Sequence, residues 1–259
     1  MTESRLHRPY FRNGADHREG QDVGFADIVR TFGFRTVSIG KWVSKQEQQL
    51  AANLFFDAFC DLLTILAVPE QVISLNGTLS LAFGTGGNKH SSAHYESTSR
   101  TLALAKNAGG GALAHEWFHA FDHYICRKLF ADASPHDFAS DCWLKGRKLI
   151  PHPLNQRLCQ YFQICFLQNG QGSEYLKRAV AIDKKLNIFY YAQPQELAAR
   201  AFEAMIQDHS LKNAFLVQGT KQSREAEIGL YPVQPLRHQL AQQLAEYFHL
   251  LGLALDSKP

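Results

Sequence analysis

Apolar residues recur at helical spacing along several long stretches of the chain. The longest stretch follows Ser44, where Glu47 three residues later gives a capping-box pattern, and Pro69 ends it. A shorter helix is expected near the start of residues 25–43. The same spacing predicts further helices over residues 112–130, 155–167, 174–186, 195–209 and 236–253.

Short apolar runs in the first half of the chain predict strands instead. Asn76-Gly77 stands between two such runs, which is the sequence signal of a β-hairpin. The predicted strands lie at residues 34–39, 72–76, 79–84, 93–97 and 100–106. The expected fold class is therefore α+β, with a small, mostly antiparallel sheet packed on helices.

The distribution of these elements predicts one folded domain. Residues 1–24 are polar and dotted with arginines, which is typical of a flexible tail. Residues 25–259 are then a single domain, with a sheet-bearing part at 25–130 and a helical part at 131–259.

Composition narrows the function classes. A net charge of only +3 argues against a nucleic-acid partner. The five cysteines are odd in number and have no CxxC spacing, so neither a disulfide framework nor a cysteine zinc site is expected. No run of 18 apolar residues and no secretory signal is recognised, which predicts a cytoplasmic protein without a membrane span.

Residues 115–119 read His-Glu-Trp-Phe-His, the HExxH pattern. On a helix, His115 and His119 lie on one face and can converge on a zinc ion at about 2.0–2.1 Å each. Glu116 then lies beside the ion, where it can take a proton from zinc-bound water. The alternative is an amphipathic helix with two buried histidines. The preceding strand and glycine turn favour the metal site.

A catalytic zinc usually has three protein ligands, so a third ligand must come from elsewhere. The short HExxHxxGxxH continuation is absent, which directs attention to a later helix. Glu196, in the first turn of the helix at 195–209, is the preferred candidate. Glu203 lies on the same face two turns later and is the alternative ligand or a supporting acid.

Other polar residues near these positions are candidates for supporting roles. Asp122 lies on the ligand face and could orient a histidine through its other ring nitrogen; the alternatives are a surface acid or a contact to Arg127. Tyr190 and Tyr191 precede Glu196, and a tyrosine hydroxyl there could donate to a developing oxyanion; core packing is the alternative. The strand at 93–97 comes just before the strand that leads into the HExxH helix. It could therefore pair with an extended peptide substrate.

These residues resemble known families. His115-Glu-Trp-Phe-His-Ala-Phe-Asp-His-Tyr124 resembles the zinc helix of the anthrax lethal factor family, and the segment from Pro194 to Glu203 resembles that family's second helix. Residues 33–209 look more closely like the first large polyvalent-protein-associated domain, which occurs in proteins of phages and conjugative elements and in stand-alone bacterial proteins named the CLCA_X family. The motifs that carry this likeness lie mainly at 93–124.

The resemblance implies a gluzincin-like zincin fold with three zinc ligands, a glutamate general base and an assisting tyrosine. The ligands would be His115, His119 and Glu196, the base Glu116, and the tyrosine Tyr190 or Tyr191. One departure is Arg200, where lethal factor-like helices carry an acid; Glu203 could replace that acid. The function expected is zinc-dependent hydrolysis of peptide bonds. The alternative is a non-catalytic protein-binding module on a zincin scaffold, associated with mobile genetic elements.

Overall fold

The computed structural model describes residues 5–85, 93–106 and 110–257. The chain divides into two compact units. Unit 1 comprises Met1–Ala120 and His209–Gln218, and unit 2 comprises Phe121–Asp208 and Gly219–Pro259. The division falls within helix α3 (Leu113–Leu129), which carries the HExxH residues.

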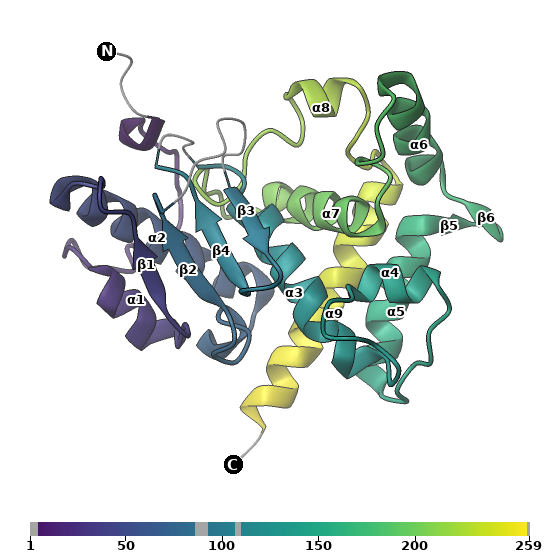
Figure 1. The fold of residues 1–259 in the computed structure, drawn as a ribbon, viewed down its shortest axis with the longest axis horizontal. Coiled ribbons are helices and arrows are strands. Elements are labelled where there is room, and N and C mark those ends of the chain that lie inside the picture. Colours follow the sequence, from purple (N-terminus) through teal and green to yellow (C-terminus); the bar gives the residue numbers. More distant parts are fainter. Residues whose placement is uncertain (1–4, 86–92, 107–109, 258–259) are drawn as a thin grey trace. The chain divides into compact units, whose positions relative to one another are not determined.

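Unit 1 contains a small mixed sheet (Figure 1). Its described strands are, in spatial order, β1 (Val37–Ile39), β2 (Ser80–Phe83), β4 (Thr101–Leu104) and β3 (Ala93–Glu96). β2 is parallel to both β1 and β4, whereas β3 is antiparallel to β4. The predicted α+β class is confirmed, but the expectation of a mostly antiparallel sheet is wrong.

The error comes from the predicted hairpin around Asn76-Gly77. Leu75, Asn76 and Gly77 all have positive φ, at 52°, 56° and 72°, which is incompatible with a continuing strand. The apolar run before them instead forms the 3-10 helix η2 (Glu70–Val72) and a turn, with Ile73 and Leu75 buried. Burial explains the apolar pattern at 72–76 without a strand.

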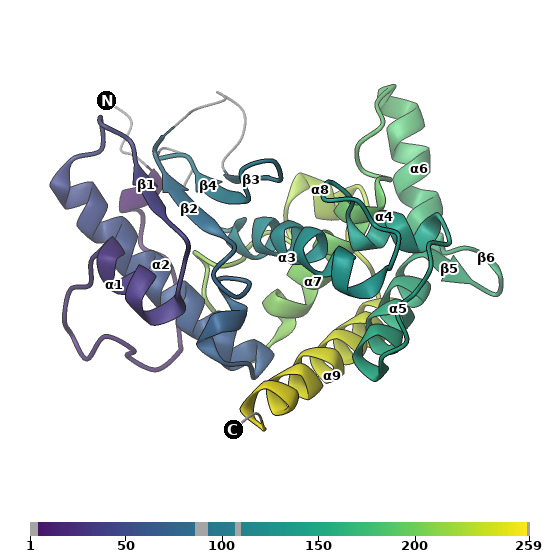
Figure 2. The same cartoon turned by 60° about the horizontal axis from the view of Figure 1, so that its bottom comes forward.

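Two helices build the core of unit 1 against this sheet (Figure 2). They are α1 (Phe25–Phe32) and α2 (Lys45–Leu66). The predicted start of α2 is confirmed: Ser44 accepts from the backbone of Glu47, whose carboxylate accepts from the Ser44 N–H. A phenylalanine cluster with ring centroids 5.2–6.3 Å apart fills the core, made up of Phe25, Phe32, Phe34, Phe55, Phe56, Phe59, Phe83 and Phe215.

Helix α2 is long and apolar enough to cross a membrane by length and composition, and half of its most apolar window is buried in the protein. It also carries Asp61, which is 0% exposed. The carboxylate accepts hydrogen bonds from Arg12 at 2.6 and 2.7 Å and from Asn213 at 2.8 Å, and lies 2.9 Å from His17 Nε2. The described part of the segment predicted to be a tail therefore has specific partners on α2.

Unit 2 is helical (Figure 1). Its described elements are α4 (Ala139–Leu144), α5 (Pro153–Phe166), β5 (Leu167–Gln168), β6 (Gln171–Gly172), α6 (Glu174–Leu186), α7 (Pro194–Asp208), α8 (Arg224–Glu227) and α9 (Leu236–Asp256). Helix α7 packs against α4, α5 and α9, and every residue from Glu196 to Ile206 is buried. Because α7 is buried on all sides, its polar side chains require hydrogen-bonding or charged partners.

The predicted long helices of this unit are confirmed within a few residues of their ends. The short helices α4 and α8 were not predicted, because both fall between the predicted helices, in segments where the sequence shows no clear helical repeat. Each is at most six residues long, which is too short for a helical repeat to show in the sequence.

Candidate metal centre

The two histidines of the HExxH pattern meet on one face of α3. His115 Nε2 and His119 Nε2 are 3.0 Å apart, and His119 is 8% exposed. Two imidazole nitrogens bound to one tetrahedral zinc ion are about 3.3 Å apart, given Zn–N distances of about 2.0–2.1 Å. The observed spacing needs little adjustment to hold such an ion. The opposite face is fixed by buried Trp117, whose indole N–H donates to the Ile73 carbonyl at 2.9 Å.

Glu116 lies beside this pair and contacts the sheet. Its Oε2 accepts a hydrogen bond of 2.8 Å from the backbone N–H of Tyr95 in β3. Because this N–H is directed to Glu116, it points away from the β4 side of the strand. The contact fixes one carboxylate oxygen of Glu116. It also places this carboxylate beside the outer edge of β3, the edge that is not paired with β4.

Glu196 is placed by the packing of α7 in unit 2. The hydroxyl of Tyr161 donates to the Ala198 carbonyl at 2.6 Å, and that of Tyr175 donates to the Leu197 carbonyl at 3.1 Å. Burial raises the pKa of both tyrosines well above its usual value, so they remain protonated donors. These two bonds, one residue apart on α7, fix the first turns of the helix and with them Glu196.

Arg200 holds the Glu196 carboxylate within the same helix. Its Nη2 donates to Glu196 Oε2 at 2.7 Å, and the two side chains are 4% and 8% exposed. Burial alone would lower the pKa of Arg200, but Glu196 and the nearby tyrosines Tyr175, Tyr190 and Tyr231 together raise it. The arginine that departs from the lethal factor pattern is thus a direct partner of the candidate ligand.

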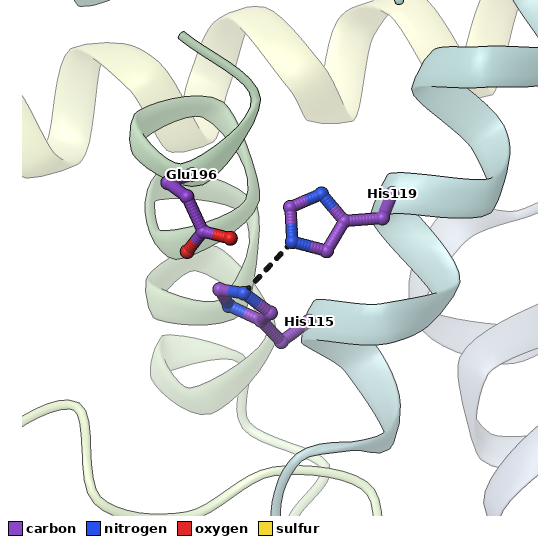
Figure 3. A group of neighbouring side chains, drawn as sticks. All are labelled: His115, His119 and Glu196. Atoms are coloured by element: carbon purple, nitrogen blue, oxygen red, sulfur yellow. Dashed lines mark hydrogen bonds between the residues drawn. The ribbon is translucent and has the colours of Figure 1, made fainter. Parts of the chain in front are cut away.

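His115, His119 and Glu196 form a group of possible metal ligands (Figure 3). One ligand atom from each residue lies within 4.8 Å of the others. Two imidazole nitrogens and one carboxylate oxygen are the donor set of a catalytic zinc with three protein ligands. The residues present therefore fit such an ion.

Glu203, the alternative third ligand, is not a member of this group. It is 5% exposed, and its Oε2 accepts a hydrogen bond of 3.0 Å from the Tyr231 hydroxyl. Burial and the nearby Glu203 charge raise the pKa of Tyr231, which keeps the hydroxyl a donor. The geometry favours Glu196 over Glu203 as the candidate ligand.

Asp122 is completely buried, so its interpretation as a surface acid is wrong. Its carboxylate accepts from Ser140 in α4, at 2.9 Å from the backbone N–H and 2.5 Å from the hydroxyl. These bonds join α3 to α4. A role for Asp122 in orienting a ligand histidine stays a prediction.

Tyr190 and Tyr191 lie in the turn between α6 and α7. Their ring centroids are 5.1 Å apart, and the Arg200 guanidinium lies 5.6 and 5.0 Å from the two rings. Both backbone N–H groups, together with that of Ala192, donate to the carboxylate of Asp183. Tyr190 is 46% exposed, which excludes full burial in the core for this residue. Hydroxyl donation to a reacting group stays a prediction for both tyrosines.

With this geometry described, comparison with known proteins adds one finding. Residues 182–255 match the family model described as "Large polyvalent protein-associated domain 1". No curated protein and no solved structure matches the chain.

This match supports the resemblance to the first large polyvalent-protein-associated domain. It covers a different part of the chain from the motifs that suggested that resemblance. The resemblance covers residues 33–209, with its main motifs at 93–124. The matched region, 182–255, therefore overlaps it only at 182–209. The match covers less than half of the chain, and the HExxH helix lies outside it. Within it lie Glu196, Arg200 and Glu203.

Sequence reasoning missed several residues that support these side chains, namely Ser140, Tyr161, Tyr175, Asp183 and Tyr231. Asp183 had a weak local signal, because an acid near a helix end before an irregular aromatic turn can accept several backbone N–H groups. The others form hydrogen bonds to residues far away in the sequence, so no local pattern predicts them.

Proposed function

We propose that this protein is a zinc-dependent metallopeptidase on a zincin-like scaffold. The observation that carries the proposal is the convergence of two imidazole nitrogens and one carboxylate oxygen, from His115, His119 and Glu196, with Glu116 next to the first histidine. Zinc is the ion that this donor set favours.

The chemistry divides between the ion and the chain. When bound, zinc would supply Lewis-acid activation of a water molecule and of the scissile carbonyl. Glu116 would take a proton from the attacking water while the water oxygen forms a bond to the carbonyl carbon. Glu116 would then give this proton to the amide nitrogen as the C–N bond breaks. The Tyr95 N–H bond to one Glu116 oxygen leaves the other oxygen for this transfer.

The substrate would be an extended polypeptide lying along β3, within the predicted strand at 93–97. β3 is at the edge of the described sheet. The N–H of Tyr95 in β3 donates to Glu116, so the outer side of this strand faces Glu116. A peptide pairing with that edge would pass beside the proposed general base. Tyr190 or Tyr191 is the candidate donor to the developing oxyanion.

The decisive experiment combines metal analysis with cleavage of a random peptide library by the full chain. The wild-type protein is expected to hold about one zinc ion and to cleave peptides. Glu116→Gln should keep the ion and lose cleavage by about 100-fold or more. His115→Ala and Glu196→Ala should lose the ion itself.

Glu203→Gln is the matched control for the third ligand. It is expected to keep zinc, because Glu203 bonds to Tyr231 outside the ligand group. A wild-type protein that binds zinc but cleaves no peptide would favour the non-catalytic module. A protein that takes up no zinc would refute the proposal.

A further inference from the structure

Residues 186–190, which comprise the last residue of α6 and the turn after it, form an unusual apolar surface that we name the apolar loop. Leu186 is 49% exposed, Ile188 43%, Phe189 76% and Tyr190 46%. The other large apolar side chains exposed in the described part of the chain are isolated along the sequence. Scattered exposed apolar residues are ordinary, whereas a contiguous group marks an interaction site.

The apolar loop is held in place by specific bonds. Buried Asp183 accepts the N–H groups of Tyr190, Tyr191 and Ala192, and its carbonyl accepts from Ile188 at 3.0 Å. The side-chain amide of Gln193 donates to the Phe189 carbonyl at 2.8 Å. These hydrogen bonds fix the backbone of the loop, while its apolar side chains remain exposed. A preorganised surface loses less conformational entropy on binding than a mobile one.

The apolar loop is also joined to the proposed zinc ligand. The Arg200 guanidinium lies over the rings of Tyr190 and Tyr191 and donates to the Tyr191 carbonyl at 3.2 Å. The same guanidinium donates to Glu196. One buried side chain thus connects the loop to the carboxylate, so the loop continues the candidate site within unit 2.

We propose that the apolar loop recognises a bulky apolar side chain of the polypeptide substrate. This inference rests on the proposed function for the nature of its occupant. Covering exposed apolar surface is favourable by about 25 cal/mol per Å², and the four side chains carry no charge that would prefer a polar residue. Four side chains are also too few for a stable subunit interface, which uses about 20–30 residues on each side.

The test measures binding separately from cleavage. The zinc-loaded Glu116→Gln full chain is exposed to a positional peptide library, in which each position in turn is fixed as Phe, Leu, Ala or Asp. At one position, Phe or Leu should be enriched about 10-fold or more over Ala and Asp. Adding Ile188→Ser and Phe189→Ser should reduce this preference to about 2-fold.

The matched control is Leu253→Ser in α9, which removes another exposed side chain of the same unit (54% exposed) and should leave the preference unchanged. Equal preference before and after the loop substitutions would overturn the inference, as would the absence of peptide binding. Loop-dependent self-association in sedimentation, or loop-dependent pelleting with phosphatidylserine vesicles, without residue preference would also overturn it.

Cleavage by the otherwise wild-type chain separates this inference from the proposed function. Loop-dependent binding of Phe-fixed peptides without any cleavage would leave the recognition surface intact and refute the peptidase. Zinc-dependent cleavage with the same residue preference in the loop variant would leave the peptidase intact and refute the surface.

Discussion

The Nη2 atom of Arg200 lies 2.7 Å from Oε2 of Glu196, and both side chains are buried in unit 2. A charge-assisted hydrogen bond of this kind fixes the direction of a carboxylate. The oxygen of Glu196 that it engages is Oε2.

Replacing this arginine should affect both stability and metal binding. Arg200→Met would leave Glu196 buried without its charged partner, which typically costs about 3–5 kcal/mol. We expect a lower midpoint in urea unfolding and weaker zinc binding in chelator competition. Arg200→Lys should recover part of both, since an ammonium keeps the charge without the planar fork.

The Arg200→Met, Glu196→Gln double variant separates the two effects. Removing both charges should restore part of the stability lost in Arg200→Met. It should leave zinc binding weak, because an amide is a poor ligand for this ion. Full zinc affinity in Arg200→Met would contradict the positioning role of the arginine.

Zinc itself should stabilise the folded chain by mass action. An ion that binds only the native state adds about 2.7 kcal/mol when its free concentration is 100 times the Kd. Thermal unfolding by calorimetry should therefore shift upward on adding zinc and downward on adding a chelator. His119→Ala should show neither shift. An unchanged wild-type Tm across both conditions would contradict the site.

Asp61 should be among the most sensitive positions of unit 1. Asp61→Asn removes the charge of a fully buried carboxylate that accepts both Arg12 bonds, and we expect a loss of about 3 kcal/mol in urea unfolding. The control is Arg30→Gln, which breaks the exposed Asp27–Arg30 pair and leaves the bond from the Gly24 N–H to Asp27 in place; it should cost less than about 1 kcal/mol. Equal losses in the two variants would show that the buried network has no special weight.

The ion pair between Glu47 and Lys106 predicts an acid dependence of stability. The hydrogen bond from Lys106 lowers the pKa of Glu47 to about 2 from its ordinary 4.5. The folded state therefore binds this proton less readily, and the stabilisation is complete above pH 4.5 and lost as pH falls toward 2. The difference in Tm between wild type and Glu47→Gln should be largest near pH 6 and shrink across that window. A difference that does not change with pH would contradict the pair.

Local sequence signals accounted for much of the fold. Ser44 and Glu47 marked the start of α2, and the 3.6-residue repeat identified the other long helices. The same repeat placed His115 and His119 on one face, because a side chain four residues along a helix lies above the first.

Strand pairing was not available from local signals. Asn76-Gly77 has a strong hairpin preference, but the strand after it found parallel partners in β1 and β4 that lie elsewhere in the sequence. For the third ligand, the sequence favoured Glu196 but left Glu203 open, since both acids share one face of α7. Their partners, Arg200 and Tyr231, are seen only in the structure.

The sequence by itself determined where the long helices lie and which two imidazoles share a face, because both depend on spacing of a few residues. Tertiary structure decided the order of the strands, the burial of Asp122 against Ser140 and the bond between Glu203 and Tyr231. These outcomes depend on packing among segments far apart in the chain. The free energy that decides them is distributed over many contacts, none of which has a signature in a short stretch of sequence.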